Sequence, residues 1–121
     1  MGYNKVIAIF QPHTYSRTAM LLNKFANALK IADLAIVSEI LAVRETNTYN
    51  IHAKDLTNKI ENSVYLKTFE DIVEYVVKTA QPGDLVLTMG GGNIYKCANM
   101  IVEKLKNTDP ETLAQNGKNS Q

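Results

Sequence analysis

Short apolar runs alternate along this chain with segments whose apolar residues recur at helical spacing. The runs at 5–10 (KVIAIF), 34–37 (LAIV) and 85–89 (LVLTM) are typical of strands buried on both faces. A shorter run at 64–66 predicts a fourth strand. Because a helical pattern separates each strand from the next, we expect an α/β fold of three layers, with helices on both faces of a mainly parallel sheet.

Four helical segments lie between and after these strands. The first follows Pro12, with Thr14 or Ser16 as its N-cap, and a weaker one covers 53–60. From Phe69 and again from Ile94, apolar residues fall at offsets of 3, 4, 7, 8 and 11, the pattern of an amphipathic helix on a sheet. The apolar face of the first helix is expected to hold Leu22, Phe25, Ala26, Leu29 and Ala32.

Size and charge exclude several classes of protein. The 121 residues are 45% hydrophobic, which is enough for one packed domain. Thirteen Lys and Arg against twelve Asp and Glu lack the basic excess that nucleic acids or anionic membranes require. No apolar run is long enough to span a bilayer. We therefore expect neither nucleic acid nor membrane as a partner.

The chain is expected to work in the cytoplasm and to end in a tail. Its single cysteine forms no internal disulfide, and no charged-then-apolar leader follows Met1, which favours a cytosolic protein. We place one domain at 1–106. Residues 107–121 are almost entirely polar, which predicts a disordered tail.

The loops that leave the carboxyl ends of parallel strands form the binding edge of such a sheet. In the first of these loops His13 and Arg17 stand four positions apart at a strand-to-helix turn, where they can face an anion beside free backbone N–H groups. Alternatively His13 caps a loop and Arg17 pairs with a surface acid. Only two of the thirteen basic residues are Arg, which makes the two interpretations equal.

Two further loops reach the same edge. Residues 90–93 (GGGN) follow a strand and open a helix, so a ligand or a neighbouring backbone can come close to the main chain there, although a tight turn that needs glycine is an equal alternative. The loop is neither a Walker A sequence nor a dinucleotide fingerprint, since Tyr95 occupies the place of the third glycine. In the long loop at 39–50, Arg44, Glu45 and Asn47 either contact a partner or are solvated.

The remaining residues that could carry chemistry are expected to have structural roles. Cys97 lies on an apolar helix face and is expected in the core, and His52 at a helix start is expected on the surface. No His, Cys and carboxylate residues stand at metal-ligand spacing, and no G-x-S-x-G turn is present. We therefore predict no catalytic residue and no metal ligand in this chain.

Three ordered motifs, at 10–18 (FQPHTYSRT), 38–48 (SEILAVRETNT) and 83–93 (GDLVLTMGGGN), carry a resemblance. They resemble the C-terminal domain of the UDP-N-acetylmuramate–L-alanine ligase branch of the Mur ligases, whose second and third motifs read D-I-Y-x-A-R-E and G-D-L-V-L-T-x-G-A-G-N. That domain usually starts with a D-D-Y-x-H-H-P segment, which is absent here. The resemblance therefore implies a Rossmann-like domain that is incomplete at its N-terminal end.

The resemblance also implies an activity. Such ligases of bacterial peptidoglycan synthesis use ATP and Mg²⁺ to make an acyl phosphate of UDP-N-acetylmuramate, which the amine of L-alanine attacks. The partners would be the central ATP-binding domain, which carries the P-loop and metal ligands, and the N-terminal UDP-binding domain of the same enzyme. This chain alone would bind no cofactor and be inactive. A stand-alone anion- or nucleotide-binding module without catalysis is the alternative.

The family's binding residues carry over onto matching positions. His13 and Arg17 match the His and the last Arg of the first motif, which lie at the L-alanine end of the product. Thr14 stands where some members have a further Arg, so Arg17 is the main cationic anchor. With these we group Gly91, Gly92 and Asn93 of the third motif as substrate-binding residues.

Overall fold

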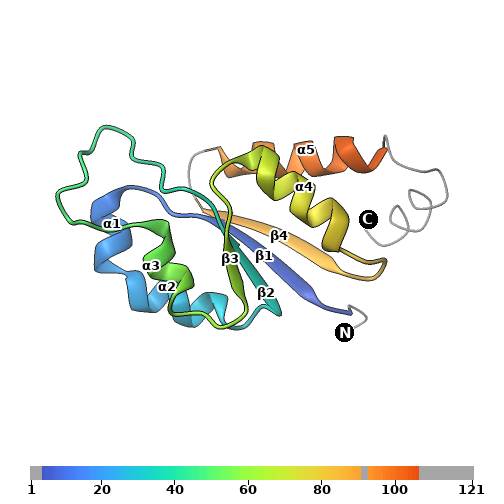
Figure 1. Cartoon of the computed structure of the whole chain (residues 1–121), viewed down its shortest axis with the longest axis horizontal. Coiled ribbons are helices and arrows are strands. Elements are labelled where there is room, and N and C mark those ends of the chain that lie inside the picture. The colour runs from blue at the N-terminus through green and yellow to red at the C-terminus, as the bar shows by residue number, and fades with distance from the viewer. Residues whose placement is uncertain (1–3, 91–92, 107–121) are drawn as a thin grey trace.

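Four parallel strands form one sheet, which confirms the predicted α/β class. The computed structural model describes residues 4–90 and 93–106. The sheet has the order β3-β2-β1-β4, and every neighbouring pair is parallel (Figure 1). The strands are β1 (Val6–Gln11), β2 (Leu34–Val37), β3 (Ser63–Tyr65) and β4 (Leu85–Gly90).

Helices cover the sheet from both sides, as the alternating pattern predicts. Figure 1 shows α1, α2 and α3 on one face and α4 and α5 on the other. Within the described residues, no helix is long and apolar enough to cross a membrane. The helices are α1 (Tyr15–Met20), α2 (Leu22–Leu29), α3 (Ala53–Thr57), α4 (Phe69–Thr79) and α5 (Ile94–Lys106).

The two faces of β1 support separate hydrophobic cores. Ala8 and Phe10 pack into the core under α1–α3, where the rings of Phe10 and Phe25 lie 5.0 Å apart. Ile7 and Ile9 pack into the core under α4 and α5. Because successive side chains of a strand point to opposite faces, a continuous apolar run is what a strand buried on both sides needs.

The single helix expected after Pro12 is in fact two, separated at Leu21. Thr18 is buried, and its hydroxyl donates a hydrogen bond of 2.7 Å to the carbonyl of Thr14. Such bonding back along a helix competes with the main chain and bends it. The N-cap of α1 is Thr14, not Ser16, since the Thr14 hydroxyl accepts the N–H of Arg17.

Two other features differ from the expectations. The helix expected at 53–60 ends at Thr57, because the following N–H groups of Lys59 and Ile60 bond three residues back and close a tighter turn. β4 is not buried on both faces: Leu87 and Met89 are 42% and 38% exposed. β4 is an edge strand, and α3 packs on β2 and β3 across the sheet from it. The tail predicted at 107–121 lies outside the described residues.

Truncation of a buried side chain should destabilise the domain, and the same truncation at an exposed site should not. Val76 is buried in the core under α4 and α5, so Val76→Ala should lower the free energy of unfolding by about 2–4 kcal/mol. Phe25→Ala should have an effect of the same size through the other core. Val102→Ala on exposed α5 surface is the matched control and should change it by less than about 0.5 kcal/mol. Urea denaturation measures all three, and equal losses for Val76 and Val102 would show that the core is misplaced.

Candidate functional site

The first and second sequence motifs lie side by side at the carboxyl edge of the sheet. After β1 the chain passes through His13, which pairs with Leu41 of the long loop as an isolated parallel bridge. The Thr14 N–H donates to the Leu41 carbonyl at 2.8 Å, and the Leu41 N–H donates to the Pro12 carbonyl at 2.9 Å. The loops that leave β1 and β2 are therefore held together, as their place at one sheet edge predicts.

Glu45 of the long loop occupies the start of α1. Its carboxylate accepts the N–H groups of Tyr15 and Ser16 at 2.7 and 3.1 Å, and the Ser16 hydroxyl at 2.5 Å. The hydrogen bonds from Ser16 and, more weakly, the one from Tyr15 and the charge of His13 lower the pKa of Glu45. Thr14 takes the next N–H, that of Arg17. The free N–H groups that the sequence predicts here for an anion are therefore already occupied.

Asn47 also serves its own loop. Its side-chain amide donates to the Ile51 carbonyl at 2.8 Å and accepts the Ile51 N–H at 3.1 Å. The sequence offered three residues of this loop as contacts to a partner. Glu45 and Asn47 make hydrogen bonds to other residues of this chain, whereas Arg44 is exposed. Sequence reasoning missed these contacts because an acid in a long loop carries no local signal of what it caps.

Arg17 presents an available cation at this edge. It lies in α1, is exposed, and has no carboxylate within ion-pair distance among residues 4–90 and 93–106, where Lys106 and Glu103 form the recorded pair. The pairing with a surface acid that was weighed for Arg17 is therefore not formed within this part of the chain. His13 is half-buried directly before the helix. Both predicted residues stand on one short segment whose position Glu45 and Leu41 fix.

Strained backbone accompanies these loops. Thr14 has φ 64° and ψ 149°, a region that β-branched residues rarely adopt, and Val43 in the facing loop has φ 60°. Such conformations each cost about 1–3 kcal/mol and persist where the surrounding contacts impose them, often at functional sites. Thr14 was predicted to bind substrate. That role stays a prediction; in the structure Thr14 caps α1 and has a strained backbone in the turn that presents Arg17.

The third motif reaches the same edge from β4. Gly90 has φ 126°, and a Cβ added to it would lie 2.5 Å from the carbonyl oxygen of Gln11. The backbone of Gln11 thus comes so close to Gly90 that only glycine fits at this position. Gly91 and Gly92, which were predicted to bind substrate, lie outside the described residues. Asn93 is half-buried directly before α5, and its Oδ1 has no hydrogen-bond partner among residues 4–90 and 93–106.

A cavity opens at the carboxyl ends of β2 and β3. It has a volume of about 310 Å³ and is lined by Glu39, His52, Lys54 and Tyr65, among others. Lys54 Nζ lies 5.6 Å from the centre of the Tyr65 ring, and burial, followed by the charge of Glu39, raises the pKa of Tyr65. His52 is exposed, as predicted, but its place on this cavity was not.

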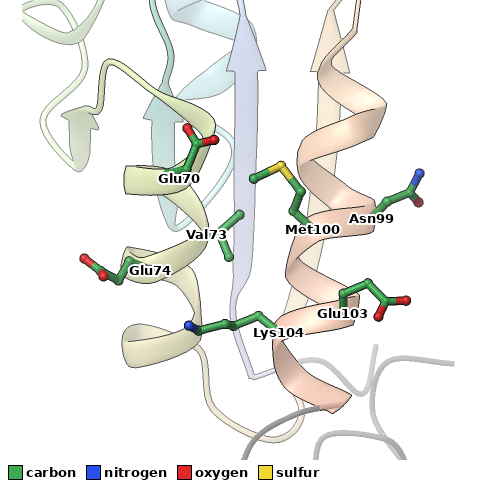
Figure 2. A pocket seen from close by; sticks show the side chains of 7 residues that line it. All are labelled: Glu70, Val73, Glu74, Asn99, Met100, Glu103 and Lys104. Carbon is green, nitrogen blue, oxygen red and sulfur yellow. The ribbon is translucent and has the colours of Figure 1, made fainter.

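A larger groove of about 510 Å³ lies between α4 and α5, on the outside of the domain. Figure 2 shows Val73 and Met100 turned toward each other across the groove, with Glu70 and Glu74 on α4 and Glu103 and Lys104 on α5. None of the predicted site residues lines it.

Cys97 is fully buried, and burial raises the pKa of its thiol to about 11, so it belongs to the core as predicted. Within the described ranges no three His, Cys, Asp or Glu residues gather as metal ligands.

The pattern of loops at this edge also occurs in known proteins. Residues 1–92 match the family model described as Mur ligase, glutamate ligase domain. The chain belongs to the Mur ligase family. Its resemblance to that family, first seen in three short motifs, thus extends over most of the chain.

Three relatives of this Mur ligase domain carry the same name. A UDP-N-acetylmuramate–L-alanine ligase of Lachnospira eligens is 49% identical over 105 residues, which are 84% of this chain and 23% of that protein. Ligases of the same name from Acetivibrio thermocellus and Caldicellulosiruptor saccharolyticus are 44% and 45% identical over 84% and 86% of the chain. The chain spans about a quarter of the length of these relatives.

A solved structure supports the fold of the Mur ligase domain. It is a domain assigned to a UDP-N-acetylmuramate:L-alanyl-gamma-D-glutamyl-medo-diaminopimelate ligase of Haemophilus ducreyi, with a TM-score of 0.61. The match covers 85% of this chain and 70% of that one at 14% sequence identity. At that identity the comparison speaks for the fold, and it agrees with the Rossmann-like sandwich that was expected.

The carboxylate of Glu45 should stabilise the Mur ligase domain in a pH-dependent way. Its folded pKa is lowered, so its contribution is complete above the ordinary value of 4.5 and is lost as the pH falls through the lower folded value. Glu45→Gln should therefore lower the melting temperature at pH 7, and the difference from the unaltered chain should shrink at about pH 3.

Thermal denaturation at both pH values measures this effect. Glu61→Gln, which removes an exposed carboxylate elsewhere, is the matched control and should change little. If the difference in melting temperature between Glu45→Gln and the unaltered chain stays constant with pH, the charge of the Glu45 carboxylate does not stabilise α1 and the prediction is wrong.

Proposed function

We propose that this chain is the C-terminal domain of a UDP-N-acetylmuramate–L-alanine ligase of bacterial peptidoglycan synthesis, working in the cytoplasm. The observation that carries the proposal is the name shared by relatives that are 44–49% identical over more than four fifths of the chain. The relatives are about four times longer. The remaining length would supply the central ATP-binding domain and the N-terminal UDP-binding domain.

The proposed reaction has two steps. Transfer of the γ-phosphoryl group of ATP to the lactyl carboxylate of UDP-N-acetylmuramate gives an acyl phosphate and ADP. The amine of L-alanine then attacks the acyl carbon, the new C–N bond forms, the C–O bond to phosphate breaks, and the nitrogen loses a proton. The described residues here hold neither a P-loop nor a cluster of Mg²⁺ ligands. ATP and Mg²⁺ would therefore be held by the central domain.

The part of this domain is to hold the amino acid. L-Alanine is small, and burial of its methyl group contributes only about 1 kcal/mol, so polar contacts must orient it. The Arg17 guanidinium suits its carboxylate, because two parallel N–H donors fix a carboxylate in one plane and leave the amine free. Arg17 is exposed at the binding edge and unpaired by any described acid, and Glu45 fixes the helix that carries it. His13 would add a weaker contact.

Loss of the guanidinium should weaken L-alanine selectively. In the full-length ligase, Arg17→Ala should raise KM for L-alanine by a factor of about 10 to 150, the worth of a charge-assisted contact, and raise KM for ATP far less. His13→Ala should act on the same substrate more weakly. Steady-state kinetics with each substrate varied in turn gives these values.

A matched control for Arg17 lies on the next helix. Lys24→Ala removes an exposed cation of α2 and should leave the KM for L-alanine unchanged. If Arg17→Ala weakens ATP and spares L-alanine, the residue belongs to the nucleotide side and this assignment is wrong.

The chain by itself should have no ligase turnover. It lacks the nucleotide and metal machinery that the first step requires, so purified chain with ATP, UDP-N-acetylmuramate and L-alanine should release no phosphate above background. The full-length ligase assayed in parallel is the positive control. Substrate-dependent phosphate release by the chain alone would overturn the proposed division of labour between domains.

A further inference from the structure

Two side-chain oxygens at the binding edge are buried without a hydrogen bond. Gln11 Oε1 and Asn93 Oδ1 are the buried side-chain atoms of the described residues that lack a partner. Gln11 is only 6% exposed, although it is polar and ends an otherwise apolar strand. Native proteins satisfy nearly all such atoms, so each exception asks for an explanation.

The fold brings both residues to one side of the sheet. Gln11 continues the alternation of Ile7 and Ile9, which pack into the core that also holds Ile94 and Cys97 of α5. Gln11 is also paired in register with Gly90, at the end of β4. Asn93 directly precedes α5. Both oxygens therefore belong to the place where the carboxyl end of β1 meets the start of α5.

Neither oxygen makes a hydrogen bond within the part of the chain that the structure describes. Asn before a helix normally accepts an N–H of the first turn, yet Asn93 Oδ1 accepts none. Methionine or leucine at position 11 would continue the apolar core without leaving a buried oxygen unpaired. A polar group that is costly to bury and makes no internal bond is explained when a ligand supplies its partner.

We propose that Gln11 and Asn93 form an acceptor site for the amino group of the incoming amino acid. A side-chain carbonyl oxygen only accepts hydrogen bonds, so its ligand must present N–H or O–H donors; the amino group of an amino acid does, and an ionised carboxylate or phosphate does not. This proposal rests on the proposed function and deepens it. Arg17 would hold the carboxylate of the substrate, and the oxygens of Gln11 and Asn93 would hold its amino group.

Both halves of this arrangement are fixed to the same strand. Gln11 is the last residue of β1, and α1, which carries Arg17, begins at Tyr15 after a turn held by Leu41 and Glu45. The two sides differ in charge, with a guanidinium on one and uncharged acceptors on the other. That difference sets the direction in which a small amino acid would lie across the strand end.

The test separates the two ends of the substrate in the full-length ligase. Propionate has the carboxylate and methyl group of alanine without the nitrogen, and ethylamine has the nitrogen without the carboxylate. Gln11→Met should raise KM for L-alanine and the inhibition constant of ethylamine about 10-fold, and leave that of propionate within about twofold. Arg17→Ala should show the opposite selectivity between the two inhibitors.

Two further variants make the result specific. Gln11→Glu keeps acceptor oxygens at this position, so it should bind ethylamine more tightly than Gln11→Met does and recover part of the loss in KM for L-alanine. Gln81→Met makes the same chemical change at an exposed site before β4 and should change nothing. In thermal denaturation of the chain, Gln11→Met should not lower the melting temperature, because it removes a buried unpaired oxygen.

The outcomes distinguish this inference from the function on which it rests. If Gln11→Met weakens ethylamine and propionate equally, weakens neither, or raises KM for ATP instead, the acceptor site is refuted. If Gln11→Met lowers the melting temperature and the KM effect is not rescued by Gln11→Glu, its role is structural and the inference is again refuted. If Arg17→Ala spares propionate while Gln11→Met behaves as expected, the carboxylate anchor of the proposed function fails and the acceptor site stands.

Discussion

β1 is the strand on which the rest of the domain is built. It pairs in parallel with β2 on one side and β4 on the other, and each of its faces carries one of the two hydrophobic cores. A strand in that position must be apolar on both faces until it reaches the sheet edge. Gln11 is the first polar residue after the apolar run and lies where the core ends and the binding edge begins. The predicted binding residues His13 and Arg17 follow it.

A long-range contact between loops holds the start of α1 at the binding edge. Glu45 is 30 residues from Tyr15 in sequence, yet its carboxylate takes the first N–H groups of α1. A helix of six residues has little stability of its own and depends on such a cap. Because the same short helix carries Arg17, the loop after β2 sets the position of a cation that follows β1. The second motif thus acts on the first without needing to contact a ligand.

Local patterns explain why the sequence predicts the strands, their parallel arrangement and the two strongest helices. Each depends on apolar spacing within about 12 residues, as in α4 and α5. The break at Leu21 and the capping by Glu45 depend instead on hydrogen bonds whose partners the spacing does not reveal. The exposed face of β4 was missed for a related reason: LVLTM has the composition of a central strand, and only the strand order makes it an edge. Residue type and loop position were enough to propose His13 and Arg17, whose roles stay predictions, whereas the unpaired Gln11 oxygen can be recognised only in the three-dimensional structure.

The distribution of polar groups around the end of β1 suits a zwitterion better than an anion alone. A phosphate site built on a helix start would leave the first N–H groups of α1 free, but Glu45 fills them with negative charge. The described residues still offer a ligand the guanidinium of Arg17 on the α1 side and, on the α5 side, two side-chain oxygens without a hydrogen bond. A group with a carboxylate at one end and an amine at the other satisfies both, and a bare phosphate satisfies only the first. The same carboxylate that stabilises α1 therefore also restricts what its edge can bind.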